Sequence, residues 1–157
     1  MSDPLAVYLH DHLAGAVVGV NLLESLRDQH SGESLGEFAS GLLKEVEADR
    51  AALQAIAERL GAGSSGVKNA AAWVSEKMSR FKLGRDEGDG LGTFEALEAL
   101  SLGILGKRAL WKALTTHSER IGQVDLERLV SRAEAQYARV EERRMALAPS
   151  ALRSATM

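Results

Sequence analysis

The sequence predicts an all-α protein with four long helices and one shorter helix. Over four stretches, apolar residues recur every three or four positions, which is the period of a helix with one buried face. No stretch shows the alternating pattern of a half-buried strand. Two long stretches follow each other closely at the start of the chain and two at the end, with residues 62–90 between the pairs.

Length and composition place limits on the kind of protein. The chain has 157 residues, which suits a single domain, expected over residues 1–149 with a frayed tail over 150–157. The absence of Cys excludes a disulfide framework, a thiolate metal site and a Cys nucleophile. A net charge of -3 gives no general attraction to nucleic acid. Because only 4% of the residues are aromatic, the core must be aliphatic, and we expect Trp73 and Trp111 in the core or in an interface.

The N-terminal region indicates neither a signal peptide nor a membrane span. It has no basic segment followed by an uninterrupted apolar run. No stretch approaches the roughly 20 apolar residues that a membrane-spanning helix needs. We therefore expect a cytoplasmic protein without a membrane span and without a nucleic-acid partner.

The first long helix is predicted over residues 4–29. Ser2 or Asp3 can serve as its N-cap, because a side-chain oxygen there accepts a hydrogen bond from a free backbone N–H. Gly15 and Gly19 lie in the middle of the helix, where each costs up to about 1 kcal/mol relative to Ala. We expect a neighbouring helix to approach closely at these glycines.

The second long helix is predicted over residues 34–60. Ser34 and Glu37 have the spacing of a capping box, in which the two side chains satisfy each other's free backbone donors. The Gly-rich run 61–66 ends this helix. A shorter amphipathic helix follows over 67–82, and we expect it to pack along the bundle as it crosses to the second pair.

The last two long helices are predicted over residues 93–117 and 125–147. Thr93 is the expected N-cap of the first, and Pro149 is expected to end the second. The links within each pair are short, so each pair should form an antiparallel hairpin. The link between the pairs contains its own helix and can travel back along the bundle, which predicts an up-down-down-up topology.

This order of helices and links resembles the ferritin-like superfamily, in particular small bacterial ferritin-like proteins with a helix in the crossover. The resemblance implies a four-helix bundle whose second and fourth helices each carry Glu-x-x-His for a di-metal centre. In this chain the corresponding segments are Glu47 to Arg50 and Glu134 to Tyr137, so both His positions are lost. Arginine has no lone pair to offer a cation. We therefore carry over no metal ligand and expect no cofactor.

Several polar residues interrupt the apolar stripes at one expected level of the bundle. Asp49 falls between Val46 and Leu53 on the buried face of its helix. A buried charge needs a partner, because an unpaired one costs several kcal/mol. The candidate site consists of His12, Asp49, Arg50, Arg108, Glu134, Gln136 and Tyr137.

Four interpretations of this candidate site stay open. In the first, it is a structural polar layer in which an arginine, Arg50 or Arg108, neutralises Asp49 and Glu134. In the second, it is a pocket for a small anion or polar ligand. In the third, His12, Asp49 and Glu134 form an unconventional metal site. In the fourth, the assignment of the buried stripes is wrong and these side chains are exposed.

The expected function follows from the lost metal ligands. We expect a non-catalytic structural or interaction protein, present as a homodimer. One alternative is an iron-binding or di-metal ferritin-like protein with altered ligands. The other is a module that binds a small polar ligand, and the fold alone does not decide among the three.

Overall fold

The computed structural model describes residues 3–61 and 90–154, and its regular elements there are all helices. The long helices are α1 (Pro4–Gln29), α2 (Ser34–Arg59), α4 (Leu91–Leu114) and α6 (Leu126–Ala151). Two short elements, η1 (Thr115–His117) and α5 (Ser118–Ile121), connect α4 to α6. The all-α prediction is confirmed for the described residues. The helix expected over 67–82 lies outside them.

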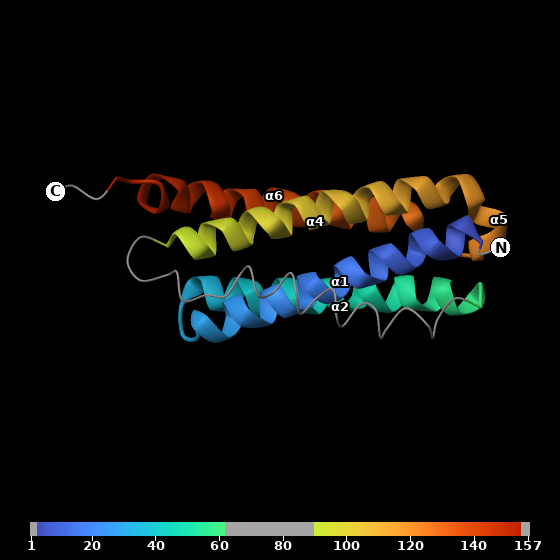
Figure 1. The fold of residues 1–157 in the computed structure, drawn as a ribbon, viewed down its shortest axis with the longest axis horizontal. Helices are drawn as coiled ribbons and strands as arrows, with labels where there is room; N and C mark the ends of the chain where they lie inside the picture. Colours follow the sequence, from blue (N-terminus) through green and yellow to red (C-terminus); the bar gives the residue numbers. More distant parts are fainter. Residues whose placement is uncertain (1–2, 62–89, 155–157) are drawn as a thin grey trace.

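The four long helices form two hairpins that lie side by side (Figure 1). At one end, His30 Nε2 lies 3.2 Å from Thr93 Oγ1, which joins the end of α1 to the start of α4. At the other end, Arg120 in α5 forms an ion pair with Asp3, just before α1. Because α1 runs antiparallel to both α2 and α4, α2 and α4 point in the same direction (Figure 1).

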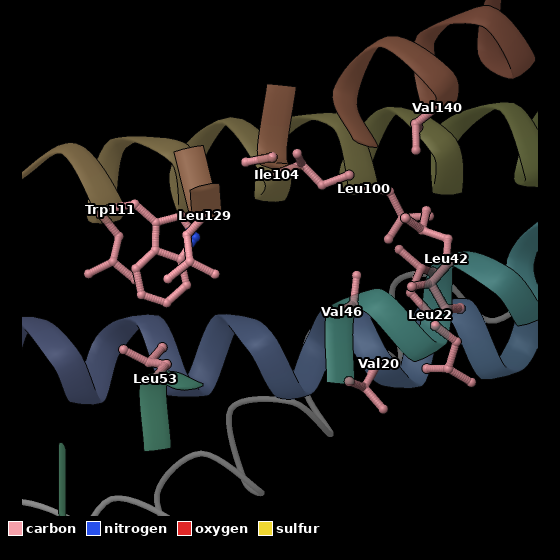
Figure 2. Close-up of a cluster of buried hydrophobic side chains, with 14 of the residues drawn as sticks. Val20, Leu22, Leu42, Val46, Leu53, Leu100, Ile104, Trp111, Leu129 and Val140 are labelled. Atoms are coloured by element: carbon pink, nitrogen blue, oxygen red, sulfur yellow. The ribbon is translucent and has the colours of Figure 1, made fainter. Parts of the chain in front are cut away.

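Aliphatic side chains from both hairpins fill the interior. Figure 2 shows Leu100 of α4 pointing toward Leu22 and Leu42 of the α1–α2 hairpin. Trp111 is completely buried, so its expected place in the core is confirmed, while Trp73 lies outside the described residues. Burying a large apolar side chain stabilises the fold by about 1.5–3 kcal/mol. These contacts therefore hold the two hairpins together.

The helix starts differ from the expected caps at two places. The Asp3 carboxylate accepts a hydrogen bond from the Leu5 N–H at 3.1 Å, so this cap is confirmed. The capping box expected at the start of α2 does not form, because the helix already includes Ser34. The hydroxyl of Ser34 instead accepts a hydrogen bond from Arg143 Nη1 at 3.1 Å. A partner from α6 thus replaces the local cap.

The N-cap of α4 is Gly90, and the expected cap at Thr93 is wrong. Gly90 has φ +76°, a left-handed conformation that glycine adopts without steric cost. Thr93 lies one turn inside the helix, is 3% exposed, and faces His30. Its hydroxyl therefore serves the contact between the hairpins.

Helix α6 continues past the residue that was expected to end it. Pro149 lies inside the helix, and Ala151 is buried at its end. Proline removes the donor for the carbonyl of Met145, but Met145 and Pro149 are both exposed, so water can reach that carbonyl. The Ser150 hydroxyl donates to the Leu147 carbonyl at 3.1 Å. The domain therefore extends beyond the predicted boundary at residue 149.

Among the described helices, α1 alone is long and apolar enough to cross a membrane. Only 17% of its most apolar window is buried by the rest of the structure, with a mean hydropathy of 1.2. The core helix of a soluble protein can pass the same test of length and composition. The expected absence of a membrane span stays a prediction.

Candidate functional site

A buried ionic cluster joins α2, α4 and α6 at the centre of the bundle. Asp49 is 2% exposed, because it occupies an apolar stripe position on the inner face of α2. Its Oδ2 accepts hydrogen bonds from Lys107 Nζ at 2.6 Å and from Gln136 Nε2 at 3.1 Å. Its Oδ1 accepts from both Nε (2.9 Å) and Nη2 of Arg132. We call these four residues the Asp49 cluster.

The Asp49 cluster contains two basic side chains and one carboxylate. Lys107 also donates to the Gln136 amide oxygen at 2.5 Å, so every polar end group in the cluster has a partner. Burial lowers the pKa of the Lys107 ammonium, and the Asp49 carboxylate opposes this shift. When Lys107 is protonated, the cluster carries one positive charge in excess.

Two further carboxylates, Glu45 and Glu134, each hold another arginine, although the charge of Glu45 also favours the protonated form of Lys107. Glu45 accepts from Arg139 Nη2 at 2.8 Å. Glu134 accepts from Arg108 Nε at 2.8 Å, and both of these side chains are substantially exposed, at 50% and 36%. The Arg108–Glu134 pair therefore lies at the surface and is separate from the buried cluster.

The expected arginine partners of Asp49 are replaced by others. Arg50 is exposed and makes no ion pair with Asp49, since consecutive helix residues point in different directions. Gln136 is completely buried in the cluster, and Tyr137 is half-buried against the core. Of the seven candidate residues, the structure therefore brings two separate pairs into direct contact: Asp49 with Gln136, and Arg108 with Glu134.

The sequence contains a signal for the missed partners. Lys107 continues the buried stripe of α4 that includes Ile104 and Trp111, and Arg132 is one turn before Gln136 in α6. A basic residue at a stripe position is the same kind of interruption that identified Asp49. Reading α4 and α6 in this way identifies Lys107 and Arg132 as candidates, but their contact with Asp49 depends on how the helices are placed against one another.

A cavity of about 470 Å³ lies beside the cluster, between α1, α2 and α4. Its wall includes Gly15 and Gly19 of α1 and Gly103 and Gly106 of α4. A Cβ atom added at any of these four glycines would meet no atom of residues 3–61 and 90–154 within 4 Å. None of the described helices therefore makes the expected close approach at Gly15 and Gly19.

Several polar groups lie among the apolar residues of the cavity wall. Asp11, His12 and Arg50 line it together with Lys107 and Trp111. Burial lowers the pKa of His12, with Asp11 opposing, which leaves a neutral imidazole at pH 7. The Trp111 Nε1–H is buried and has no acceptor among the described residues. A buried donor without an acceptor costs about 1–3 kcal/mol.

The unconventional metal set is not assembled. His12 and Asp49 both line the cavity, but Glu134 is exposed and pairs with Arg108. Within residues 3–61 and 90–154, no three His, Asp or Glu side chains gather as they would around a metal ion. Asp49 is instead surrounded by basic groups and an amide.

Chemically, the arrangement offers a mostly apolar space whose wall also contains two basic and two acidic side chains, Arg50 and Lys107 with Asp11 and Asp49. Comparison of the chain with protein-family models, with curated proteins and with solved structures finds no match. The proposals below therefore depend on the geometry of the bundle.

Proposed function

We propose that this protein is a ferritin-like bundle that binds a small molecule in its interior and has no catalytic role. The observation that carries this proposal is the cavity of about 470 Å³ between α1, α2 and α4. Cavities of roughly 300–1,000 Å³ with mostly apolar walls and a few polar groups are typical of small-molecule sites. The Asp49 cluster supplies such polar groups through Lys107.

The glycines of the cavity wall support a binding role. Each glycine inside a helix costs about 0.8–1.0 kcal/mol relative to Ala, so the four together cost roughly 3–4 kcal/mol. That is a large share of the 5–15 kcal/mol by which a folded domain is stable. Against residues 3–61 and 90–154, alanine would fit at every one of these positions. A wall that stays open at this cost is consistent with a ligand that occupies the space.

The helix directions support the ferritin-like assignment. Two antiparallel hairpins with α2 and α4 pointing the same way match the order of that superfamily (Figure 1). At the positions of the family's metal ligands, Glu47, Arg50 and Glu134 are exposed. An interior held by Lys107 and Arg132 repels a metal cation, which disfavours the di-metal alternative.

The proposal is tested with diphenylhexatriene, a narrow neutral probe that fluoresces only in an apolar environment. We expect saturable binding of one probe per chain. Gly19→Leu places a side chain into the cavity and should abolish this binding. The matched control is Gly41→Leu, because Gly41 is also a helical glycine with open space at its Cβ position but does not line the cavity.

The two variants separate cavity binding from general stickiness. Loss of probe fluorescence in Gly19→Leu with full retention in Gly41→Leu supports an internal site. Equal binding by both variants, or no saturable binding by the folded wild-type protein, overturns the proposed function. Circular dichroism of each variant verifies that the bundle remains folded.

A further inference from the structure

We propose that the solvent-facing side of α4 binds a second copy of this chain, with the two α4 helices antiparallel across a twofold axis. The contact surface, which we call the outer row, consists of seven exposed residues of this helix: Leu91, Glu95, Glu98, Leu102, Leu105, Ala109 and Lys112. None of them lines the cavity, so this inference is independent of the proposed function. It gives the expected homodimer a specific interface.

The outer row has the spacing of a contact between two long helices. Successive members are separated by four and three residues in strict alternation, from residue 91 to residue 112. This is the repeat with which one helix packs lengthwise along another. The side of a helix that faces only water is normally charged or polar throughout. Apolar residues in such a row therefore indicate a partner.

Large apolar side chains are concentrated on the outer row. Within residues 3–61 and 90–154, six large apolar side chains are exposed, and three of them, Leu91, Leu102 and Leu105, belong to this row. Leu102 is 64% exposed, and Leu105, one turn later, is 36% exposed. Exposed apolar residues that are scattered singly are ordinary, whereas a cluster on one face is typical of an interaction site. These two leucines form the centre of the row.

The outer row is complementary to its own reverse, which is what a twofold interface requires. When Leu102 of one copy faces Leu105 of the second, the symmetry places the same pair on the other side of the axis. Counting outward from this centre, Glu95 of each copy faces Lys112 of the other. The two charge pairs are about 25 Å apart along the helix, at 1.5 Å per residue. Apolar contacts at the centre thus have opposite charges at both ends.

The charges favour the antiparallel arrangement over the parallel one. In a parallel pair in register, Glu95 would face Glu95 and Lys112 would face Lys112, and like charges across an interface are unfavourable. Within the part of the chain that the structure describes, neither residue forms an ion pair. Both side chains are therefore available to a second copy.

The other carboxylate of the outer row is balanced within its own chain. The pKa of Arg144 in α6 is raised by its hydrogen bond to Glu141 and also by the nearby charge of Glu98. In the antiparallel pair, Glu98 faces Ala109 of the second copy, whose small side chain leaves room for this carboxylate. No acidic residue of the row then faces another.

The first test measures the mass of the full-length protein by sedimentation over a series of concentrations. One helix from each copy makes a small interface, so we expect a reversible dimer with a dissociation constant on the order of micromolar. Leu102→Glu places a carboxylate against Leu105 of the second copy and should raise this constant at least about hundredfold. The matched control is Leu152→Glu, because Leu152 is 62% exposed but lies outside the row. That variant should dimerise like the wild type.

The second test reverses the charges at the ends of the row. Glu95→Lys and Lys112→Glu each create two like-charge pairs, so each should weaken the dimer about tenfold. The double variant exchanges the two charges and should restore wild-type affinity. An equimolar mixture of the two single variants should form heterodimers, because every end pair is then again of opposite charge. A parallel dimer would not be weakened by either single reversal.

Each outcome supports or overturns the proposal. A wild-type protein that sediments as one chain at every concentration overturns it, and so does a dimer on which Leu102→Glu and Leu152→Glu act equally. A dimer that Leu102→Glu separates but that neither single charge reversal weakens overturns the antiparallel arrangement. Circular dichroism verifies that each variant is folded, and all four substituted residues are exposed in the single chain.

Discussion

Replacement of Asp49 by alanine should destabilise the protein strongly. The substitution leaves Lys107 and Arg132 without their carboxylate, and these side chains are only 16% and 23% exposed. Breaking a buried ion pair from one side costs about 3–5 kcal/mol. Lys107 can lose its proton and thereby limit the penalty, so we expect the lower end of this range, about 3 kcal/mol.

The assay is urea unfolding followed by circular dichroism. For a slope of about 1–3 kcal/mol/M, a loss of 3 kcal/mol lowers the midpoint by roughly 1–3 M. The matched control is Glu134→Ala, which also removes a helical carboxylate that holds an arginine. Because Glu134 and Arg108 are exposed, that change should cost less than about 1 kcal/mol.

A combined variant isolates the electrostatic cause. Asp49→Leu together with Lys107→Met and Arg132→Met removes every charge of the cluster while keeping its bulk. Replacement of a complete buried ion pair by apolar residues is often neutral or stabilising, so this variant should recover most of the stability lost in Asp49→Ala. Equal, small effects of Asp49→Ala and Glu134→Ala would refute the reasoning, since Asp49 would then be hydrated.

Three further predictions concern backbone space, protonation and assembly. Gly36→Ala should destabilise the protein, because its Cβ would lie 2.1 Å from the His30 carbonyl oxygen. In the same helix, the Cβ of Gly41→Ala would meet no described atom within 4 Å, so this variant should stabilise the protein by about 0.5–1 kcal/mol. Urea unfolding compares the two variants. The pKa of His12 in the folded protein lies below its ordinary value of 6.5. At pH values between the folded and the ordinary pKa, the unfolded chain therefore binds more protons than the folded protein. The free energy of unfolding should accordingly fall as the pH falls through this range. Titration of the His12 ring by NMR measures the pKa, and His12→Gln should flatten that pH dependence; a pKa at or above 6.5 would contradict the assigned burial effect. If the expected homodimer forms, light scattering should give twice the 16.8 kDa chain mass. Leu102 is an apolar residue that is 64% exposed, so Leu102→Glu should then reduce the mass to that of one chain. A wild-type mass of one chain would contradict the dimer.

Local sequence signals predicted the helices well, because the relevant interactions are local. The range 4–29 agrees with α1, whose start depends on Asp3 and Pro4 within one turn. The predicted cap was wrong where the polar side chain binds a distant residue instead. The Ser34 hydroxyl of α2 accepts a hydrogen bond from Arg143 of α6. Helix ends that are decided by contacts between hairpins are not visible in a local pattern.

The candidate site was only partly predictable for a related reason. The burial of Asp49 follows from its position in the stripe of α2. Its partners follow from how α4 and α6 are rotated and shifted against α2, which one helix's pattern does not contain. The glycines were ambiguous in the same way. A glycine inside a helix suits either close packing or open space, and only the neighbouring helices decide which one holds at Gly19.

The position of the Asp49 cluster explains why the bundle can keep a cavity and still hold its shape. Hydrogen bonds from Lys107 and Arg132 to one carboxylate fix α4 and α6 against α2. Helix α1 contributes nothing to this cluster, although Gly15 and Gly19 form much of the cavity wall. Gly103 and Gly106 of α4 form the facing part of the wall, so the cavity lies between a helix that the cluster holds and one that it does not. The cluster therefore fixes one side of the cavity while α1 forms the other.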